Sequence, residues 1–385
     1  MNGNPIDPGT TNVPSIKAGT RFARVWVPGA MAVSALGALV AASLRFRPTP
    51  RPTQTPARLG SQPLGTAGSP AHVDPTGSSR LAVAPGSSPP TLVSAGAARV
   101  FERTYLRTAV LGGFTSPDAF RRSLVGIAVG MRDHVFTLGD DEVRVFDPQL
   151  RRVRTWPALD HASCIAVGPD DRVYIGSAGR VDVYDPEGNH AAGFAAGNRD
   201  KPADVTAIAV VGVDILVADA QARLIRRYDL DGTPRGTIGD RSKTGSFILP
   251  NRSLDLAVDR RGIVYATDSG RHQVTAWAVD GSPRGRFGKF GMTAPEDFVG
   301  CCNPVNVAVT PDGNIVTGEK MVARVKMFDP EGTLLAVIGP EHFSPASTHI
   351  FLAVDSKGRI LTADPVRREV KVFSPGQVHQ ELREP

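Results

Sequence analysis

A short apolar tripeptide recurs along the C-terminal two thirds of the chain. It reads Ile-Ala-Val or a close variant, and its central alanines follow one another after 38, 43, 48, 51 and 45 residues: Ala128, Ala166, Ala209, Ala257, Ala308 and Ala353. Self-similarity with a period of about 20–50 residues is typical of solenoids and propellers. A unit of this length has room for four short strands, which make one blade of a β-propeller.

The residues that follow each tripeptide also keep a constant order. A tight turn such as 310–313 (TPDG) comes first, and an apolar run such as 315–319 (IVTGE) comes second. A third run, such as 325–332 (VKMFDPEG), then ends in an aromatic residue and another turn. Turns of Pro, Asp and Gly close hairpins, and a small alanine suits the innermost strand, where blades crowd around the axis. We therefore predict an all-β, six-bladed propeller.

This pattern resembles the NHL repeat, which combines an IAVD-like strand, a DG turn, a VADT-like strand and a V-x-x-F-D-x-x-G strand. The resemblance covers about residues 120–375, and unit four departs from it at Trp277-Ala278-Val279. The sixth unit stops after its third run near Phe373. We expect residues 100–111 to supply its missing outer strand, because this would close the ring and remove an exposed edge. The resemblance also implies a scaffold that binds other molecules.

The N-terminal hundred residues differ in character from the repeats. Residues 25–44 contain no charge and are long enough to span a bilayer, while residues 45–95 are rich in Pro, Ser, Gly and Thr. We predict a cytoplasmic tail (1–24), a single transmembrane helix (25–44), a disordered linker (45–95) and a periplasmic propeller (96–385). A signal peptide cleaved after Ala42 is the alternative, and it would give a secreted protein.

Charge argues against nucleic acid as a partner. Of 44 Lys and Arg residues and 38 Asp and Glu residues, eight basic and two acidic ones lie in residues 1–95, which accounts for the whole net charge of +6. The remainder of the chain is formally neutral and lacks the basic footprint that phosphate binding requires. We expect no nucleic-acid partner, and the sequence does not indicate an oligomeric state.

The long connections between units mark the face where we expect binding. They cover residues 198–204, 240–253, 289–304 and 340–349. In a propeller these connections share one face with the loops between second and third strands, whereas the tight turns lie on the other. Binding residues concentrate on long loops. We predict that a protein or an envelope ligand binds to this loop-rich face.

Two sets of repeated positions supply candidate residues on that face. Carboxylates end most second runs, and as a ring they could hold Ca²⁺, although the NHL resemblance implies that they bond to neighbouring backbone: Asp140, Asp219, Asp268, Glu319 and Asp364. The residue just before each tripeptide should face the channel mouth: Gly126, Cys164, Ala207, Asp255, Asn306 and Phe351. Glu319 and Lys320 could form an acid–base pair or an ion-paired surface couple.

The sharpest local feature is Cys301-Cys302-Asn303 at the end of the longest loop. Adjacent cysteines can form a strained disulfide, hold a soft metal, or remain ordinary thiols. A Zn²⁺ or copper site would need further ligands, for which the candidates with Cys302 are His161, Cys164 and His349. No CxxC or HxxxH spacing supports such a site, so all three alternatives stay open.

Motifs typical of catalysis are missing from the sequence. It contains no GxSxG, no P-loop and no GxGxxG between a strand and a helix. The ligand set of metal-dependent six-bladed lactonases does not match any motif here. We therefore expect a binding module rather than an enzyme. The alternatives are a metal- or thiol-dependent propeller enzyme, either a lactonase-like hydrolase or a lyase, and a redox partner that uses Cys301 and Cys302.

Overall fold

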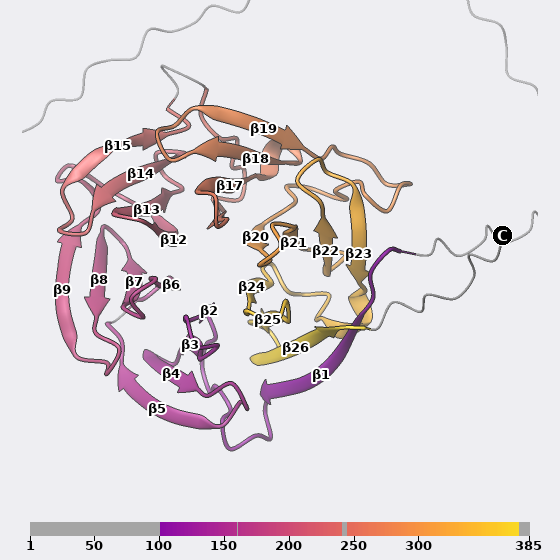
Figure 1. Ribbon diagram of the computed structural model, residues 1–385, viewed down its shortest axis with the longest axis horizontal. Helices are drawn as coiled ribbons and strands as arrows, with labels where there is room; N and C mark the ends of the chain where they lie inside the picture. The colour runs from indigo at the N-terminus through magenta and orange to yellow at the C-terminus, as the bar shows by residue number, and fades with distance from the viewer. Residues whose placement is uncertain (1–100, 160, 241–244, 377–385) are drawn as a thin grey trace, which may run out of the picture. The chain divides into compact units, whose positions relative to one another are not determined.

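The computed structural model describes residues 101–159, 161–240 and 245–376. Six four-stranded antiparallel sheets are arranged around a central axis, as Figure 1 shows. The predicted all-β, six-bladed propeller is confirmed. The predicted tail (1–24), transmembrane helix (25–44) and linker (45–95) lie outside the described residues. Within those residues, no helix is long and apolar enough to cross a membrane.

The first three blades follow one another along the chain from the inner strand outward. Blade 1 contains β2 (Gly126–Val129), β3 (Val135–Gly139), β4 (Glu142–Phe146) and β5 (Arg152–Pro157). Blade 2 contains β6 (Cys164–Val167), β7 (Val173–Ser177), β8 (Arg180–Tyr184) and β9 (His190–Ala195). A small hairpin of β10 (Gly197–Asn198) and β11 (Lys201–Pro202) leads to blade 3. Blade 3 contains β12 (Val205–Val211), β13 (Asp214–Asp219), β14 (Leu224–Asp229) and β15 (Pro234–Ile238).

The other three blades keep this order, with two short 3₁₀ helices in their loops. Blade 4 contains β16 (Leu256–Val258), β17 (Ile263–Asp268), η1 (Ser269–Arg271), β18 (Gln273–Ala278) and β19 (Pro283–Phe287). Blade 5 contains β20 (Asn306–Val309), β21 (Ile315–Glu319), β22 (Arg324–Phe328) and β23 (Leu334–Ile338), and η2 (Pro340–His342) follows it. Blade 6 contains β24 (Phe351–Val354), β25 (Ile360–Asp364), β26 (Glu369–Pro375) and β1 (Tyr105–Gly112).

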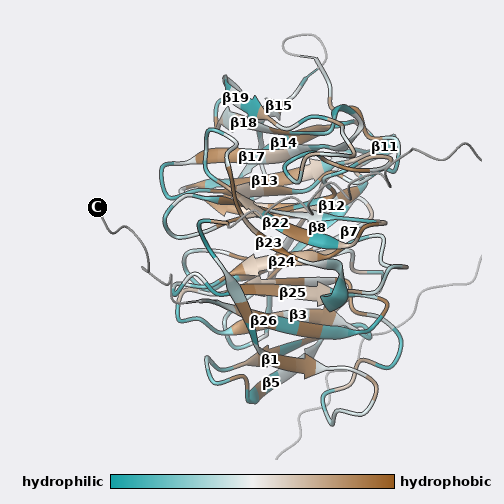
Figure 2. Ribbon diagram, turned by 90° about the vertical axis from the view of Figure 1, so that its right-hand side faces the viewer, coloured by the Kyte–Doolittle hydropathy of each residue, from teal (hydrophilic) through white to brown (hydrophobic). Residues whose placement is uncertain are grey.

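The hydrophobic core lies between neighbouring blades. Leu216 and Ala218 of β13, for example, pack in one cluster with Val264 and Ala266 of β17 in the next blade. Figure 2 shows the propeller from its rim, with apolar strand residues stacked from blade to blade. The second strands bury both of their faces in this way, so they read as near-continuous apolar runs, whereas outer strands such as β5 and β19 are mostly exposed.

Blade 4 departs from the repeat less than its sequence suggests. Trp277 pairs with Val264 in the register that Phe328 and Ile315 occupy in blade 5. Its indole is 8% exposed and donates a hydrogen bond of 2.9 Å to the hydroxyl of Thr275. Trp277 therefore fills the aromatic position of the repeat, and only the Asp that usually follows is replaced, by Ala278.

The N-terminal strand closes the ring, as predicted. β1 pairs antiparallel with β26, from Tyr105 opposite Pro375 to Gly112 opposite Glu369. Just ahead of β1, the backbone N–H of Arg103 donates to the carbonyl of Leu335 at 3.0 Å. The first and last parts of the described chain thus share one sheet, and the outer edge of β26 is paired.

Removal of β1 should destabilise the propeller. A chain that begins at residue 113 leaves β26 unpaired, so we expect a loss of several kcal/mol and a melting temperature lower by roughly 10 °C, or aggregation. A chain that begins at residue 101 is the control and should melt like the full chain. Equal melting temperatures for the two truncated chains, measured by calorimetry, would contradict closure by β1.

Candidate binding face

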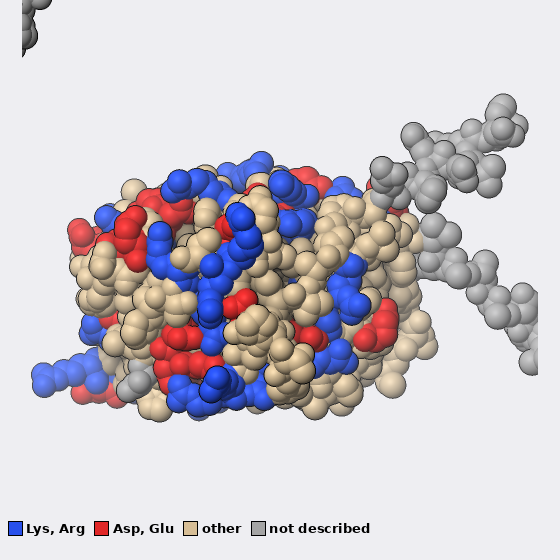
Figure 3. All heavy atoms as spheres, turned by 90° about the horizontal axis from the view of Figure 1, so that it is seen from below, with Lys and Arg blue, Asp and Glu red and all other residues tan. Residues whose placement is uncertain are grey.

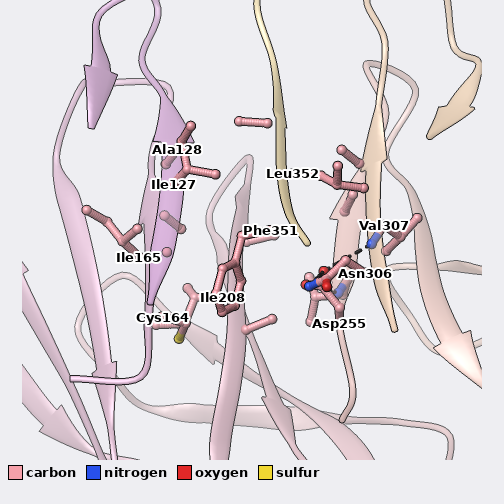
Figure 4. A pocket seen from close by; sticks show the side chains of 18 of the residues that line it. Ile127, Ala128, Cys164, Ile165, Ile208, Asp255, Asn306, Val307, Phe351 and Leu352 are labelled. Carbon is pink, nitrogen blue, oxygen red and sulfur yellow. Dashed lines mark hydrogen bonds between the residues drawn. The ribbon is translucent and has the colours of Figure 1, made fainter. Parts of the chain in front are cut away.

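A narrow cavity of about 280 Å³ follows the propeller axis, lined by the first strand of every blade. Most of the residues that line it are of apolar type, and Figure 4 shows Asp255 and Asn306 together on one side. All six residues that we expected at its mouth line it: Gly126, Cys164, Ala207, Asp255, Asn306 and Phe351. The inner strands thus bring positions from six blades to one opening.

Asp255 and Asn306 link three blades at this mouth. The carboxylate of Asp255 accepts hydrogen bonds of 3.0 Å from both the side-chain amide of Asn306 and the backbone N–H of Val307. It also accepts one of 2.9 Å from the backbone N–H of Leu256. Burial in the channel raises the pKa of Asp255 to about 6 despite these donors. The oxygen of Asn306 in turn accepts from the backbone N–H of Ile350 in the next blade, at 3.2 Å.

Short hydroxyl side chains continue this linkage around the ring. Ser163 donates to the carbonyl of Val205, Thr206 donates to the carbonyl of Leu254, and Ser253 donates to the carbonyl of Val305. Each bond joins one blade to the next. The polar residues at the channel mouth thus hold the inner strands together, which the sequence alone did not reveal.

The carboxylates at the ends of second strands anchor the loops of the face. Asp140 accepts from the backbone N–H groups of Arg121, Arg122 and Ser123 in the preceding connection. The other four carboxylates each accept a hydrogen bond from a backbone N–H in the connection before their blade. Asp219 accepts from Asp204, Asp268 from Ile248, Glu319 from Val299 and Asp364 from Ser344. The backbone role that the NHL resemblance implied is therefore the observed one. The ring of free carboxylates for Ca²⁺ is not formed.

Buried cations on the third strands complete this anchoring. Lys326 is fully buried, and its ammonium lies 2.8 Å from Glu319 while it donates to the carbonyls of Pro295, Glu296 and Asp297. Burial lowers the pKa of Lys326 to about 8, and the charge of Glu319 opposes that shift. The ring of Phe298 lies 4.3 Å from the ammonium.

Other blades place a polar side chain at the same register. Arg144 opposite Thr137 donates to the carbonyls of Asp118 and Ala119, and Lys371 opposite Thr362 donates to that of His342. Sequence reasoning missed these cations. One signal in the sequence could have found them, because a charged residue recurs at the same position of the third strand in five of the six repeats. These residues are Arg144, Asp182, Arg226, Lys326 and Lys371.

Glu319 and Lys320 do not form a pair. Glu319 is fully buried and bonds to Arg324 at 2.9 Å and to Lys326 at 2.8 Å. Lys320 is half-buried, and its backbone N–H and carbonyl both bond to the amide of Asn303. Neighbouring residues along a strand point to opposite sides, so Glu319 and Lys320 form neither the acid–base pair nor the ion-paired surface couple considered above.

Cys301 and Cys302 lie at the loop-rich face with their sulfur atoms 2.8 Å apart. Both are free thiols here, with Cys301 exposed and Cys302 only 4% exposed. Asn303 holds the segment, because its amide donates to the carbonyls of Val299 and Lys320 and accepts from the N–H of Lys320. Burial raises the pKa of the Cys302 thiol to about 11.

The four residues considered for a soft metal do not come together. Cys164 is at the inner end of blade 2 and Cys302 precedes blade 5, so the ring places them on opposite sides of the channel. Burial raises the pKa of the Cys164 thiol to about 12, and His161 is exposed. His349 stacks on Phe351. In the described part of the chain, no three or more His, Cys, Asp or Glu residues could hold a metal ion together.

Exposed apolar side chains gather on the loop-rich face. Of the large exposed hydrophobic residues in loops and turns, most lie in its connections: Phe114, Leu159, Ile248, Phe290, Met292, Met321, Val322 and Val366. Met131, Val213 and Leu230 lie on the other face. Phe290 and Met292 lie on one connection, and Met321 and Val322 lie on one loop. The ring of Phe290 contacts His272, and the sulfur of Met321 lies beside Gly300. The rim seen in Figure 3 instead carries interspersed charges of both signs.

Known structures with a similar fold support the propeller architecture. A protein of unknown function from Bacteroides thetaiotaomicron has a TM-score of 0.52 and 16% identity, over 69% of this chain and 72% of that chain. A streptogramin B lyase has a TM-score of 0.50 and 11% identity, over 70% of this chain and 98% of that chain. At such identities the likeness shows the fold alone. No protein-family model and no curated protein sequence matches the chain.

The buried cation of blade 5 should be important for stability. Lys326→Met leaves three carbonyls and part of the Glu319 charge without a partner, so we expect a loss of about 3–5 kcal/mol in the free energy of unfolding. The control is Lys289→Met, because Lys289 is 75% exposed and lies 3.7 Å from Asp297, a geometry that contributes less than about 1 kcal/mol. Chemical denaturation measures both. Equal losses would contradict a special role for the buried cluster.

Proposed function

We propose that this chain is a membrane-tethered, NHL-type propeller that binds a protein partner through its loop-rich face in the extracytoplasmic space. The observation that carries the proposal is the gathering of exposed apolar side chains on that face. Phe290 is 56% exposed, Met292 is 76% exposed and Met321 is 60% exposed, all on connections that lead into or through blade 5. Aromatic residues and methionine are enriched at protein interfaces.

The chemistry of the face favours a protein partner over a small polar ligand. Its five strand-end carboxylates are engaged by backbone N–H groups of the neighbouring connections. Asp255 and Asn306 are likewise engaged with neighbouring blades. Exposed apolar side chains such as Met292 are left to contact another molecule, alongside exposed charged ones such as Arg121 and Lys289. Exposed apolar patches typically mark interaction sites. Methionine side chains adapt to partners of varied shape.

Rigid support strengthens this proposal. The loops that carry the apolar residues are fixed at their bases, as at Val299 by Glu319 and at Ile248 by Asp268. A pre-ordered surface loses little conformational entropy on binding. The membrane tether, periplasmic location and linker are proposed from residues 1–95 of the sequence, where an uncharged stretch precedes a Pro- and Ser-rich one.

Site-specific photo-crosslinking in the native host tests which face binds. A photoreactive residue in place of Met292 should give a discrete crosslinked species, because this position is on the proposed face. The same residue in place of Met131, which is 65% exposed on the opposite face, is the matched control and should give none. Crosslinking from position 131 alone, or none from either position, would contradict the proposal.

Cell fractionation tests the tether separately. The full chain should stay with membranes after an alkaline wash, and deletion of residues 25–44 should move it to the soluble fraction, because the apolar span is lost. External protease should digest the propeller only after the outer barrier of the cell is opened. A soluble mature protein that begins at Ser43 would show signal cleavage after Ala42 and contradict the membrane tether. It would not affect the proposal that the loop-rich face binds a partner.

A further inference from the structure

The adjacent thiols of Cys301 and Cys302 have a geometry that the binding proposal does not use. Their sulfur atoms are 2.8 Å apart, within about 1 Å of the disulfide bond length of about 2.04 Å. We propose that this pair is a thiol–disulfide exchange site, which reacts with low-molecular-mass disulfides and closes into a reversible disulfide between the two neighbours. This inference is independent of the proposed binding function.

The local backbone holds the two sulfurs together. Cys302 has a left-handed backbone with φ of 65°, and Gly300, on the other side of Cys301, has φ of 75°. On one side, the N–H of Val299 donates to Glu319, and on the other, the amide of Asn303 makes its three bonds to Val299 and Lys320. Two reacting groups held in contact behave as if at a very high local concentration. The frame thus favours closure within the pair over reaction with a second chain.

Exposure gives the two thiols different roles. Cys301 is exposed and can meet a disulfide from solution, whereas Cys302 is 4% exposed and cannot. Burial disfavours the Cys302 thiolate, but the ammonium of Lys320 nearby acts in the opposite direction. Cys301 is therefore the attacking thiol. Cys302 is the resolving thiol, and its sulfur lies 2.8 Å from that of Cys301.

The reaction balances as two successive exchanges. The thiolate of Cys301, having lost its proton to solvent, attacks one sulfur of the incoming disulfide, forms a mixed disulfide and expels the first thiolate. Cys302 then loses its proton and attacks the sulfur of Cys301, which expels the second thiolate. The two cysteines are oxidised, the incoming disulfide is reduced to two thiols, and the two expelled thiolates take up two protons.

The product should be easy to reduce again. Neighbouring Cα atoms are about 3.8 Å apart across a trans peptide, whereas disulfides usually join Cα atoms about 4.4–6.8 Å apart. A bridge between neighbours is therefore strained, and strained, exposed disulfides are the labile ones. The pair lies in the connection that also carries Phe290 and Met292.

Redox titration of the full chain with reduced and oxidised glutathione tests this site. After acid quenching, free thiols are labelled with a maleimide and the intact mass is measured. We expect the wild type to lose two labelled thiols in one step, with a mass about 2 Da lower, and to recover both in excess reduced glutathione. Cys164→Ser should behave in the same way, because Cys164 is buried and far from the pair.

Two further variants separate the roles of the cysteines. Cys302→Ser should stop at a glutathione adduct on Cys301, about 305 Da heavier, because no resolving thiol remains, and Cys301→Ser should react at least about 10-fold more slowly. Circular dichroism checks that both variants are folded. The proposal is overturned if wild-type thiols persist at every glutathione ratio, if the wild type also stops at the stable adduct, or if oxidation joins two chains.

Discussion

The buried carboxylate at the end of a second strand is the interaction on which the loop-rich face depends. A connection of ten or more residues between blades exposes many backbone N–H and C=O groups that no strand can pair. The carboxylate takes the N–H groups, as Asp140 does for Arg121, Arg122 and Ser123. A cation on the third strand takes the C=O groups, as Lys326 does. Together these ions replace the hydrogen bonds that secondary structure would have supplied.

Blades that lack the third-strand cation satisfy the same requirement by other means. Blade 4 has Thr275 at that register, and Arg271 from the 3₁₀ turn just before the third strand instead bonds to Asp268 and to the carbonyl of Ser246. Blade 2 inverts the arrangement, because Asp182 stands on the third strand and bonds to Arg180 and His190. The constraint is thus the satisfaction of buried backbone and charge, and several residue patterns meet it.

The fold could be predicted from the sequence because its determinants are local. The inner alanines, the hairpin turns and the apolar runs repeat at near-constant spacing, and the unfinished sixth unit pointed to closure by the strand before the first. The site could be predicted only in part, because its bonds join residues that are far apart in the chain. Glu319 was matched with its neighbour Lys320, whereas its partners Arg324 and Lys326 lie across the hairpin. Similarly, only the ring geometry separates Cys164 in blade 2 from Cys302 before blade 5.

Many polar groups of the loop-rich face are engaged in stabilising its own loops. Another molecule must therefore be recognised by the side chains that stay exposed. Asp255 is the titratable carboxylate that lines the axial cavity, and its oxygens already hold Leu256, Asn306 and Val307. A general base or a metal ligand there would have to break the links between blades. Contact with exposed groups such as the side chain of Met292 or the thiol of Cys301 would not break these links. The proposed recognition by surface contact leaves these links between blades intact, whereas acid–base catalysis by Asp255 would compete with them.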